Sequence, residues 1–235
     1  MTAREVDVEV MGRRERKKKG THEALLAAAT RLFAEHGIYV TTIEEITDAA
    51  DLGKGTFYKH FESRDAIIAA VLHQGFGQLN AHMRAEVGAH GDTGAIIRDV
   101  VAVHTRFFGE RPEYLLLFHQ ARGWLKLAGQ HRNPVREEFR AYVDVLADLL
   151  GHSDPGKALG AEGRRREARV LAGIISGTFS YEVIVGGGDL AAMELVRDLA
   201  RIGSALEGGP APAVPGRGAP KTAGGGPRRP SRKRA

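Results

Sequence analysis

Apolar residues recur at spacings of three and four from Thr21 to about Leu206, and this periodicity is the strongest constraint on the fold. One face of an α-helix returns about every 3.6 residues, whereas a half-buried strand alternates roughly every two residues. Almost no alternating pattern occurs in this stretch. We therefore expect an all-α fold built from successive amphipathic helices.

The first two predicted helices are marked by the residues at their ends. Gly37 ends the first helix in a position suited to a left-handed cap. Thr42 begins the second, because Thr42 and Glu45 have the spacing of a capping box. The buried face of the first helix is predicted to contain Leu25, Leu26, Ala29, Leu32 and Phe33. That of the second is predicted to contain Ile43, Ile46 and Ala49.

A short turn, Asp51-Leu52-Gly53, separates the second helix from a predicted third helix of about eight residues, Lys54 to Phe61. Two short helices joined this closely form a helix-turn-helix pattern. Phe57 and Phe61 lie on the same side of the third helix and mark its buried face. The opposite surface contains no acidic residue and offers Gly55, Thr56, Tyr58, Lys59 and His60.

These side chains suit the groove of a DNA duplex. Lysine can donate to guanine, threonine can contact a thymine methyl group, and a glycine allows close approach of the backbone. Tyr58, His60 and Thr42 can hydrogen-bond phosphates. Arg64 brings a cation to the first turn of the next helix, which Ser63 is expected to cap.

The run from Ala24 to Leu72 resembles the N-terminal DNA-binding domain of the TetR/AcrR family of regulators. The resemblance is carried by LFAEHG, TTIEEI and GKGTFYKHF and by the serine-capped helix that follows. It implies that Thr42 and Arg64 touch the DNA backbone. The turn Asp51-Leu52-Gly53 departs from the family's usual small-Gly-Val-Ser turn. The recognition surface that the resemblance implies consists of Lys54, Gly55, Thr56, Tyr58, Lys59 and His60.

Four regions follow from the pattern: a flexible basic arm (1–20), a helix-turn-helix domain (21–66), a helical ligand-binding and dimerisation domain (67–206) and a disordered basic tail (207–235). The assignment of ligand binding and dimerisation to the third region is implied by the resemblance. In this third region, the first helix is predicted to start after Ser63 and to run past Leu79. Further helices are predicted over Thr93–Phe108, Pro112–Leu125, Pro134–Leu150, Glu162–Val185 and Asp189–Leu206. Asn133 is the expected cap of the helix that begins at Pro134, and a loop precedes the last two helices.

The last two helices are the candidates for a homodimer interface. Their apolar positions are Val170, Leu171, Ile174, Ile175, Tyr181, Leu190, Met193, Val196 and Leu199. Small residues that allow close approach are Gly173, Ser176, Gly177 and Ser180. The alternative is that both helices pack within one subunit. A two-fold dimer would read half-sites roughly 34–36 Å apart on double-stranded DNA, so the predicted operator is palindromic.

An effector pocket is expected among the aromatic residues between positions 100 and 145. The candidate ligand-binding residues are Phe107, Phe108, Tyr114, Phe118, His119, Arg122, Trp124 and Tyr142, with His104 and Phe139 nearby. The alternative for each aromatic residue is a place in the core. A bound effector would favour a spacing of the DNA-binding domains that no longer fits two major grooves, which releases the DNA. A drug, an acyl-CoA and a sterol all remain open as effectors.

The net charge of +5 is concentrated at the two ends of the chain. Residues 1–20 hold seven Lys/Arg against four Asp/Glu, residues 207–235 hold seven against one, and residues 21–206 carry a net charge of −4. Basic ends suit a polyanion. They leave open a second hypothesis, an architectural DNA binder that does not read sequence and is dominated by Arg228, Arg229, Arg232, Lys233 and Arg234. Arg13, Arg14, Arg16 and Lys17 to Lys19 precede the first helix and can similarly lie along the DNA backbone.

Several other classes are excluded or disfavoured. The chain has no cysteine, so disulfides, thiolate nucleophiles and cysteine-bound zinc are excluded. Residues 151–158 approach a phosphate-binding loop, but Ala158 stands where serine or threonine should hold magnesium, and the segment follows a helix. We expect no enzyme activity, catalytic residue, cofactor or metal. No run of roughly 18 apolar residues and no signal peptide is found, so a cytoplasmic protein without a membrane partner is predicted.

Overall fold

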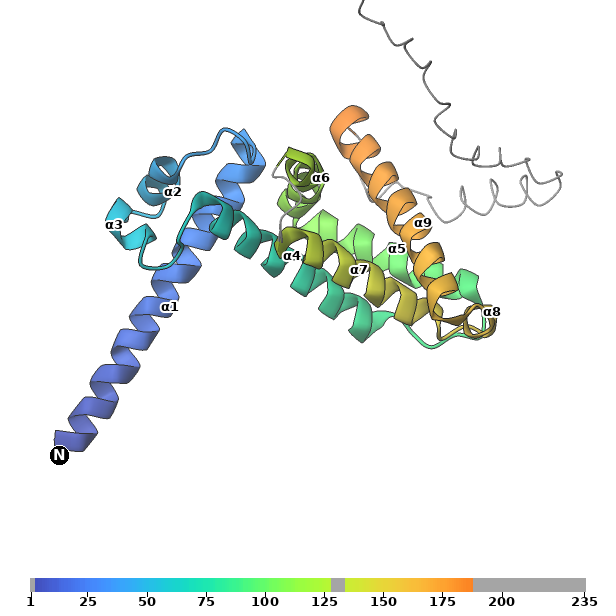
Figure 1. Ribbon diagram of the computed structural model, residues 1–235, viewed down its shortest axis with the longest axis horizontal. Helices are drawn as coiled ribbons and strands as arrows, with labels where there is room; N and C mark the ends of the chain where they lie inside the picture. The colour runs from blue at the N-terminus through green and yellow to red at the C-terminus, as the bar shows by residue number, and fades with distance from the viewer. Residues whose placement is uncertain (1–2, 128–133, 188–235) are drawn as a thin grey trace, which may run out of the picture. The chain divides into compact units, whose positions relative to one another are not determined.

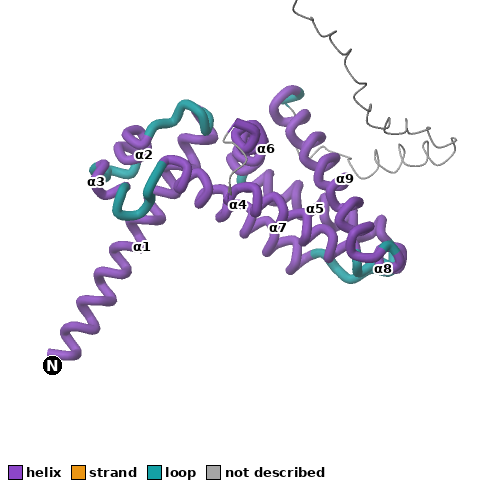
Figure 2. The backbone as a smooth tube through the Cα atoms, in the orientation of Figure 1, coloured by secondary structure: helices purple, strands orange, loops and turns teal. Residues whose placement is uncertain are grey.

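The computed structural model describes residues 3–127 and 134–187. These residues form helices joined by loops and contain no strand, which confirms the all-α prediction (Figure 2). The elements in chain order are α1 (Ala3–His36), α2 (Ile43–Ala49), α3 (Lys54–Phe57), α4 (Arg64–Glu86), α5 (Thr93–Glu110), α6 (Pro112–Leu127), α7 (Pro134–Leu150), α8 (Asp154–Ala158), α9 (Gly160–Ser180) and the π-helical turn η1 (Tyr181–Val185).

The helix-turn-helix region consists of α1, α2, α3 and the start of α4. Helix α1 packs against α2 and α4, and α2 packs against α3 (Figure 1). Gly37 has φ +103° and ends α1, as predicted, with its N–H donating to the carbonyl of Phe33 at 3.0 Å. Three predicted core positions differ. Leu26 and Ile43 are only half-buried. Ala49 is exposed, whereas Thr47, next to the completely buried Ile46, is buried in its place.

Helix α1 begins much earlier than the sequence pattern suggested. Residues 3–20, expected to be a flexible arm, are helical and continue into α1 without a break. The segment is rich in arginine, lysine and glutamate, which favour helix, and it contains no proline. Gly12 and Gly20 are tolerated within it.

The third helix is shorter than expected. Helix α3 ends at Phe57 instead of Phe61, and residues 58–60 form hydrogen-bonded turns. The N–H of Lys59 donates to the carbonyl of Thr56 at 3.1 Å, and that of His60 to Phe57 at 2.8 Å. These tighter bonds still turn Phe61 into the core, where it is 6% exposed.

The remaining helices form a layered body that begins at α4. Helix α4 packs against α5 and α7, and α7 packs against α9 (Figure 1). The predicted boundary between residues 66 and 67 falls inside α4, so one helix belongs to both regions. The core between these helices contains Phe76, Leu79, Met83, Val100, Val145 and Phe179, all nearly inaccessible to solvent.

Part of the predicted loop between residues 151 and 161 is a short helix, α8. Ser153 caps it, with its hydroxyl accepting from the N–H of Gly156 at 3.0 Å and donating to the carbonyl of Leu150 at 2.9 Å. A Cβ atom at Gly156 would lie 1.8 Å from that carbonyl oxygen, so this turn requires glycine. The segment resembling a phosphate-binding loop is therefore a capped turn after a helix.

Several predictions fall outside the described residues. They are the cap at Asn133, the helix over 189–206 and the tail over 207–235. Every described residue belongs to the unit Met1–Asp198.

Candidate nucleic-acid interface

The start of α2 is fixed by the predicted capping box. The hydroxyl of Thr42 accepts from the N–H of Glu45 at 3.2 Å, and a carboxylate oxygen of Glu45 accepts from the N–H of Thr42 at 2.7 Å. The latter bond holds the pKa of Glu45 below its usual value. Because Ile46 and Phe57 are completely buried, α2 and α3 are held against the rest of the domain at both ends of the turn.

The turn between α2 and α3 contains a residue in a conformation that favours glycine. Asp51 has φ +52°. Gly53 is the N-cap of α3 and provides no side-chain hydrogen bond, so α3 begins without the cap that serine would supply. The departure from the family's turn therefore keeps the fold but leaves one backbone donor without a side-chain partner.

The outer surface of α3 and of the turn that follows it, residues 54–60, is the one that the sequence pattern predicted; we call it the α3 surface. Gly55 and Lys59 are exposed, Tyr58 is 52% exposed, and Thr56 and His60 are half-buried. A Cβ atom at Gly55 would meet nothing within 4 Å, so this backbone is open to a ligand. No acidic residue occurs between positions 54 and 60.

The two lysines of this surface differ in their surroundings. Lys54 forms an ion pair with Glu44 of α2, and its hydrogen bond lowers the pKa of Glu44. Lys59 forms no ion pair within the described residues. Lys59, in the turn after α3, can therefore pair with an incoming anion without first breaking a salt bridge.

The predicted DNA-backbone contacts of Thr42 and Arg64 compete with internal hydrogen bonds. The hydroxyl of Thr42 donates to Glu45 at 2.9 Å. The Nε of Arg64 donates to the carbonyl of Thr41 at 2.7 Å, and its Nη2 donates to that of Ile38. Arg64 thus braces the loop between α1 and α2, and contact of its remaining N–H groups with phosphate stays a prediction.

Sequence reasoning missed the neighbour of His60. His22 of α1 stacks on Phe61 with ring centroids 4.8 Å apart and lies 5.9 Å from His60. Burial lowers the pKa of His60, and His22 and Lys18 lower it further. His22 is distant from the recognition segment in sequence and has no motif of its own, so only tertiary packing reveals it.

A small internal cavity lies in the body, where an effector pocket was expected. Its volume is about 30 Å³, close to that of one water molecule. Of the eight predicted ligand-binding residues, four line it: Phe108, Phe118, Arg122 and Tyr142. The other lining residues are Phe76, Leu79, His104, Leu115, Phe139, Ile175 and Ser176.

The structure places the other four predicted ligand-binding residues elsewhere. Phe107 and Trp124 are buried outside the cavity lining, and His119 is exposed. Tyr114 packs directly on α4, where a Cβ atom at Gly75 would lie 2.4 Å from its ring. Helical periodicity alone could not separate the eight candidates, because it does not show which buried residues of α5, α6 and α7 meet around one space.

A buried polar pair forms part of the cavity wall. The Nδ1 of His104 lies 2.7 Å from the carbonyl of Val100, and its Nε2 lies 2.9 Å from the hydroxyl of Tyr142. Because a carbonyl only accepts, Nδ1 carries the proton and Nε2 accepts from Tyr142. Burial lowers the pKa of His104 to about 4, so its ring is neutral at physiological pH.

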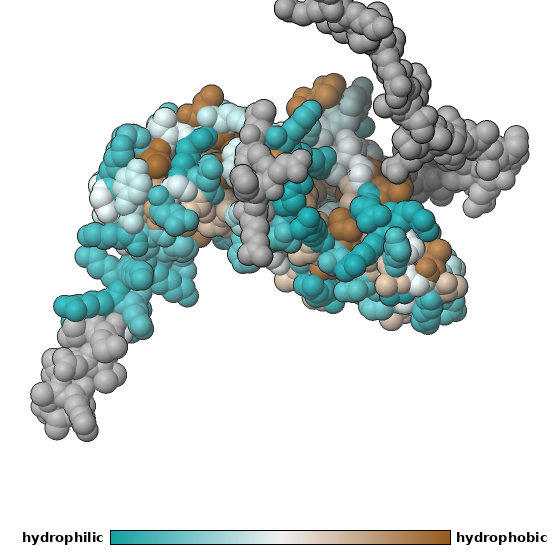
Figure 3. All heavy atoms as spheres, viewed as in Figure 1, coloured by the Kyte–Doolittle hydropathy of each residue, from teal (hydrophilic) through white to brown (hydrophobic). Residues whose placement is uncertain are grey.

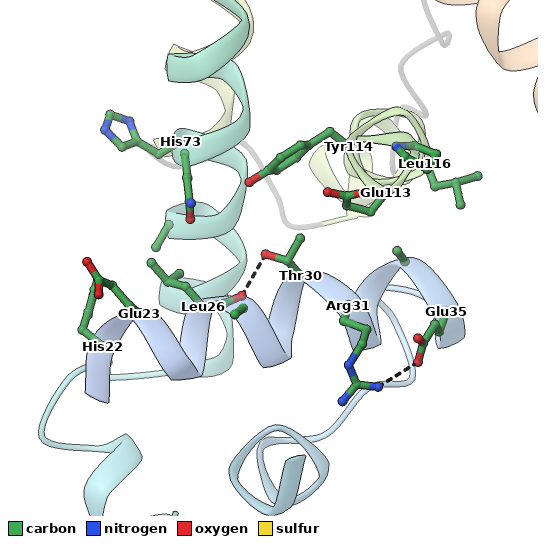
Figure 4. Close-up of a pocket in the computed structure, with 15 residues that line it drawn as sticks. His22, Glu23, Leu26, Thr30, Arg31, Glu35, His73, Glu113, Tyr114 and Leu116 are labelled. Atoms are coloured by element: carbon green, nitrogen blue, oxygen red, sulfur yellow. Dashed lines mark hydrogen bonds and ion pairs between the residues drawn. The ribbon is translucent and has the colours of Figure 1, made fainter. Parts of the chain in front are cut away.

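A larger groove of about 1060 Å³ lies outside the core, between α1, α4 and α6. Figure 4 shows Tyr114 reaching from α6 towards α4, with Leu26, Thr30 and the Arg31–Glu35 ion pair on α1. Near it, the side chain of Gln120 accepts from the N–H of Ile38 at 2.7 Å. These contacts connect α6 of the body to the DNA-binding helices.

Comparison with known proteins agrees with this geometry. Residues 25–71 match the family described as bacterial regulatory proteins, tetR family. The chain is 33% identical over 84 residues to the transcriptional repressor KstR2 of Rhodococcus jostii, which is 36% of this chain and 41% of that protein. It is 27% identical over 168 residues to the regulator AcrR of Shigella flexneri, which is 67% of this chain and 75% of that protein.

A solved structure extends the likeness to the body. The regulator FadR of Bacillus subtilis, in complex with stearoyl-CoA, superposes with a TM-score of 0.62 at 17% identity, covering 77% of this chain and 96% of that protein. At this identity the likeness concerns the fold.

A capped α2, a tight turn and an α3 with a basic outer surface define a helix-turn-helix DNA-binding protein. Residues 25–71 match the tetR family model, and the helical body has the fold of the solved regulator FadR. Over residues 25–71 the chain matches the tetR family of bacterial regulatory proteins, and over 168 residues it is similar to the regulator AcrR.

Proposed function

We propose that the protein represses transcription by binding a palindromic operator as a homodimer and that a small-molecule effector releases it. The observation that carries the proposal is the exposed α3 surface, where Gly55, Tyr58 and Lys59 face solvent while Phe57 anchors the turn. Lys59 and Tyr58 supply donors for base edges and phosphates.

The dimer is supported by the outer face of α9 and η1. Val170 is 59%, Tyr181 63% and Val185 67% exposed, although all three are large apolar residues. Gly173 and Gly177 are exposed with no neighbour near their missing Cβ atoms, so a second helix can approach closely. Leu171 and Ile175, which were predicted for the same stripe, are buried within the subunit, so only part of that stripe is free for a partner.

The segment Gly160–Val185 also has the length and apolar composition of a membrane span, and it is the one such segment found in residues 3–127 and 134–187. Its packing against α7 and the ion pair of Arg165 with Asp144 favour a protein–protein interface over lipid. A DNA-binding role places the protein in the cytoplasm, where the chromosome lies.

The effector is expected in the cavity beside His104. At about 30 Å³ the cavity is too small for a drug-sized molecule, so binding must move the aromatic side chains around it. An apolar chain suits walls formed by Phe76, Phe108 and Phe118, and Arg122 can receive an anionic group. Because the Bacillus subtilis neighbour binds stearoyl-CoA, acyl-CoAs are the first effectors to test.

Expansion of this cavity would have a direct route to the DNA-binding helices. Helix α6 carries Phe118 in the cavity wall and, two residues later, Gln120 bonded to the loop that precedes α2. An effector that displaces α6 therefore shifts that loop. Because α2 and α3 follow the loop, the spacing of the two DNA-binding regions in a dimer changes with it.

The proposal is tested by selection from a randomised duplex library at about 150 mM salt, where nonspecific phosphate contacts are weakened. Enrichment of a palindrome supports a dimeric, sequence-reading regulator. Lys59→Ala should change which bases are preferred, whereas Lys126→Ala, at an exposed position near the end of α6, should leave the motif intact. Binding without any motif would favour the architectural hypothesis, and an absence of binding would contradict both.

Acyl-CoAs of increasing chain length are then added to the complex with the selected operator. Release at micromolar concentrations by one chain length, but not by coenzyme A alone, supports the effector assignment. Phe118→Trp, which fills the cavity, should weaken release without weakening operator binding. Equal release by every chain length would contradict recognition in this cavity.

A further inference from the structure

The N-terminal extension of α1 presents an unusual density of cations next to the recognition surface. Six of its basic residues are exposed: Arg13, Arg14, Arg16, Lys17, Lys18 and Lys19. Figure 1 shows this part of α1 running past α3, and Figure 3 shows its described surface as hydrophilic. Because the extension is helical, the position of each basic residue in the sequence sets the side of α1 on which it lies.

One side of this helix faces α3. Glu15, Lys18, Lys19 and His22 line a shallow depression of about 260 Å³ together with His60. His22 contacts the rings of Phe61 and His60 directly. Since residues four apart lie above one another on a helix, Arg14, Lys18 and His22 form a single row, which we call the α1 stripe.

The α1 stripe is poorly neutralised by the protein itself. Neither Arg14 nor Lys18 forms an ion pair within residues 3–127 and 134–187. Lys19 pairs with Glu23 at 3.8 Å, and Glu15 is the one acidic residue lining the depression. Lys18 contributes to the lowered pKa of His60, as expected for neighbouring basic groups. Such a row attracts a polyanion placed against α3.

We propose that the α1 stripe is a second DNA-contact surface, which binds backbone phosphates flanking the groove occupied by α3. The proposal rests on DNA binding by α3. From His22 to Arg14 the helix rises about 12 Å, which corresponds to roughly three to four base pairs along a strand. The stripe therefore adds phosphate contacts beyond the bases that α3 reads and carries no sequence preference of its own.

The helix provides its own matched control. Arg13 and Lys17 have the same spacing and the same total charge as Arg14 and Lys18, but they lie on the side of α1 facing away from His60. A general attraction between a basic helix and DNA would depend equally on both pairs. Contact through the stripe depends on Arg14 and Lys18.

The experiment compares Arg14→Gln/Lys18→Gln with Arg13→Gln/Lys17→Gln. Affinity for the selected operator, extended by about one helical turn at each end, is measured against salt concentration. Each lost phosphate contact lowers the magnitude of the log–log slope by about 0.9, so the stripe variant should lose about 1.8 per protomer and the control much less. The preferred sequence should not change in either variant.

Two results would overturn the proposal: a wild-type slope in the stripe variant, or equal losses in both variants. Trimming the flanking base pairs adds a second readout, because wild type and the stripe variant should then bind alike. The slopes can also be measured on a duplex of arbitrary sequence. An absence of any preferred sequence for wild type would therefore contradict the proposed function while leaving the test of the stripe in place.

Discussion

The neutral His104 in the core should make the stability of this protein depend on pH in a defined way. Burial lowers the pKa of His104 from 6.5 to about 4 in the folded protein, while the unfolded chain keeps an ordinary value. The unfolded chain therefore takes up the proton first as the pH falls. Stability from this residue is complete above about pH 6.5 and is lost towards about pH 4.

The magnitude follows from the two pKa values. Each unit of difference is worth about 1.4 kcal/mol once both states respond fully. Between about pH 7 and about pH 5 the proton linkage of this single residue lowers the free energy of unfolding by about 2 kcal/mol. That is a large fraction of the roughly 5–15 kcal/mol that stabilises a typical domain.

The test compares wild type with His104→Gln by urea denaturation at both pH values. Glutamine does not titrate and can still offer an oxygen to the hydroxyl of Tyr142. The variant is expected to be less stable at neutral pH but to lose about 2 kcal/mol less on acidification, because only the titration of His104 differs.

Proton NMR of wild type supplies an independent measurement. The ring signal missing from His104→Gln assigns His104, and its midpoint should lie near pH 4. The reasoning would be refuted by parallel pH dependence of stability in the two proteins or by a midpoint of the assigned signal near that of a free histidine.

Three further predictions concern single contacts. Gly75→Ala should destabilise the protein by roughly 1–3 kcal/mol in urea denaturation, because the new methyl group would lie 2.4 Å from the ring of Tyr114. Asp51→Gly should stabilise it by about 0.5–1 kcal/mol in the same assay, because φ +52° strains a side chain but not glycine. Glu44→Gln should tighten binding to all duplexes and steepen the salt dependence by about 0.9 in slope, because Lys54 is released to contact phosphate.

Each of these changes has a control nearby. Gly77→Ala, on the exposed side of the same helix with open space around it, should stabilise by about 0.5–1 kcal/mol, so equal effects at both glycines would contradict the packing argument. Asp51→Ala should move stability in the opposite direction to Asp51→Gly. Glu110→Gln removes a distant exposed carboxylate and should leave the salt slope near that of wild type.

The sequence by itself determined the class of fold and which side of residues 54–61 is exposed. Capping interactions are local. Thr42 bonds with Glu45, and Ser63 accepts from the N–H of Ala66, each within one turn of helix. The buried side of α3 was predicted equally well, because Phe57 and Phe61 are large apolar residues beside charged ones. The helix starts at Arg64, Thr93, Pro112 and Pro134 followed from such local signals.

Tertiary structure decided which of the equivalent aromatic residues line the cavity. Phe107 and Phe108 are adjacent in sequence and both buried, yet only Phe108 lines it. Tyr114 packs on Gly75 instead of lining the cavity, because the missing side chain of Gly75 lets α6 approach α4. Periodicity predicts which side of a helix is buried. It does not predict which residues, distant in sequence, pack against that side.

Long-range contacts also decided what the charged residues do. The resemblance implied a contact of Arg64 with the DNA backbone, and the structure shows its guanidinium bonded to the carbonyls of Ile38 and Thr41. Lys54 and Lys59 look alike in sequence, and only the approach of α2 gives Lys54 a carboxylate partner. Pattern fixes which residues a helix exposes, because it depends on spacing, but the partners that set their charge and hydrogen bonding depend on how the helices pack.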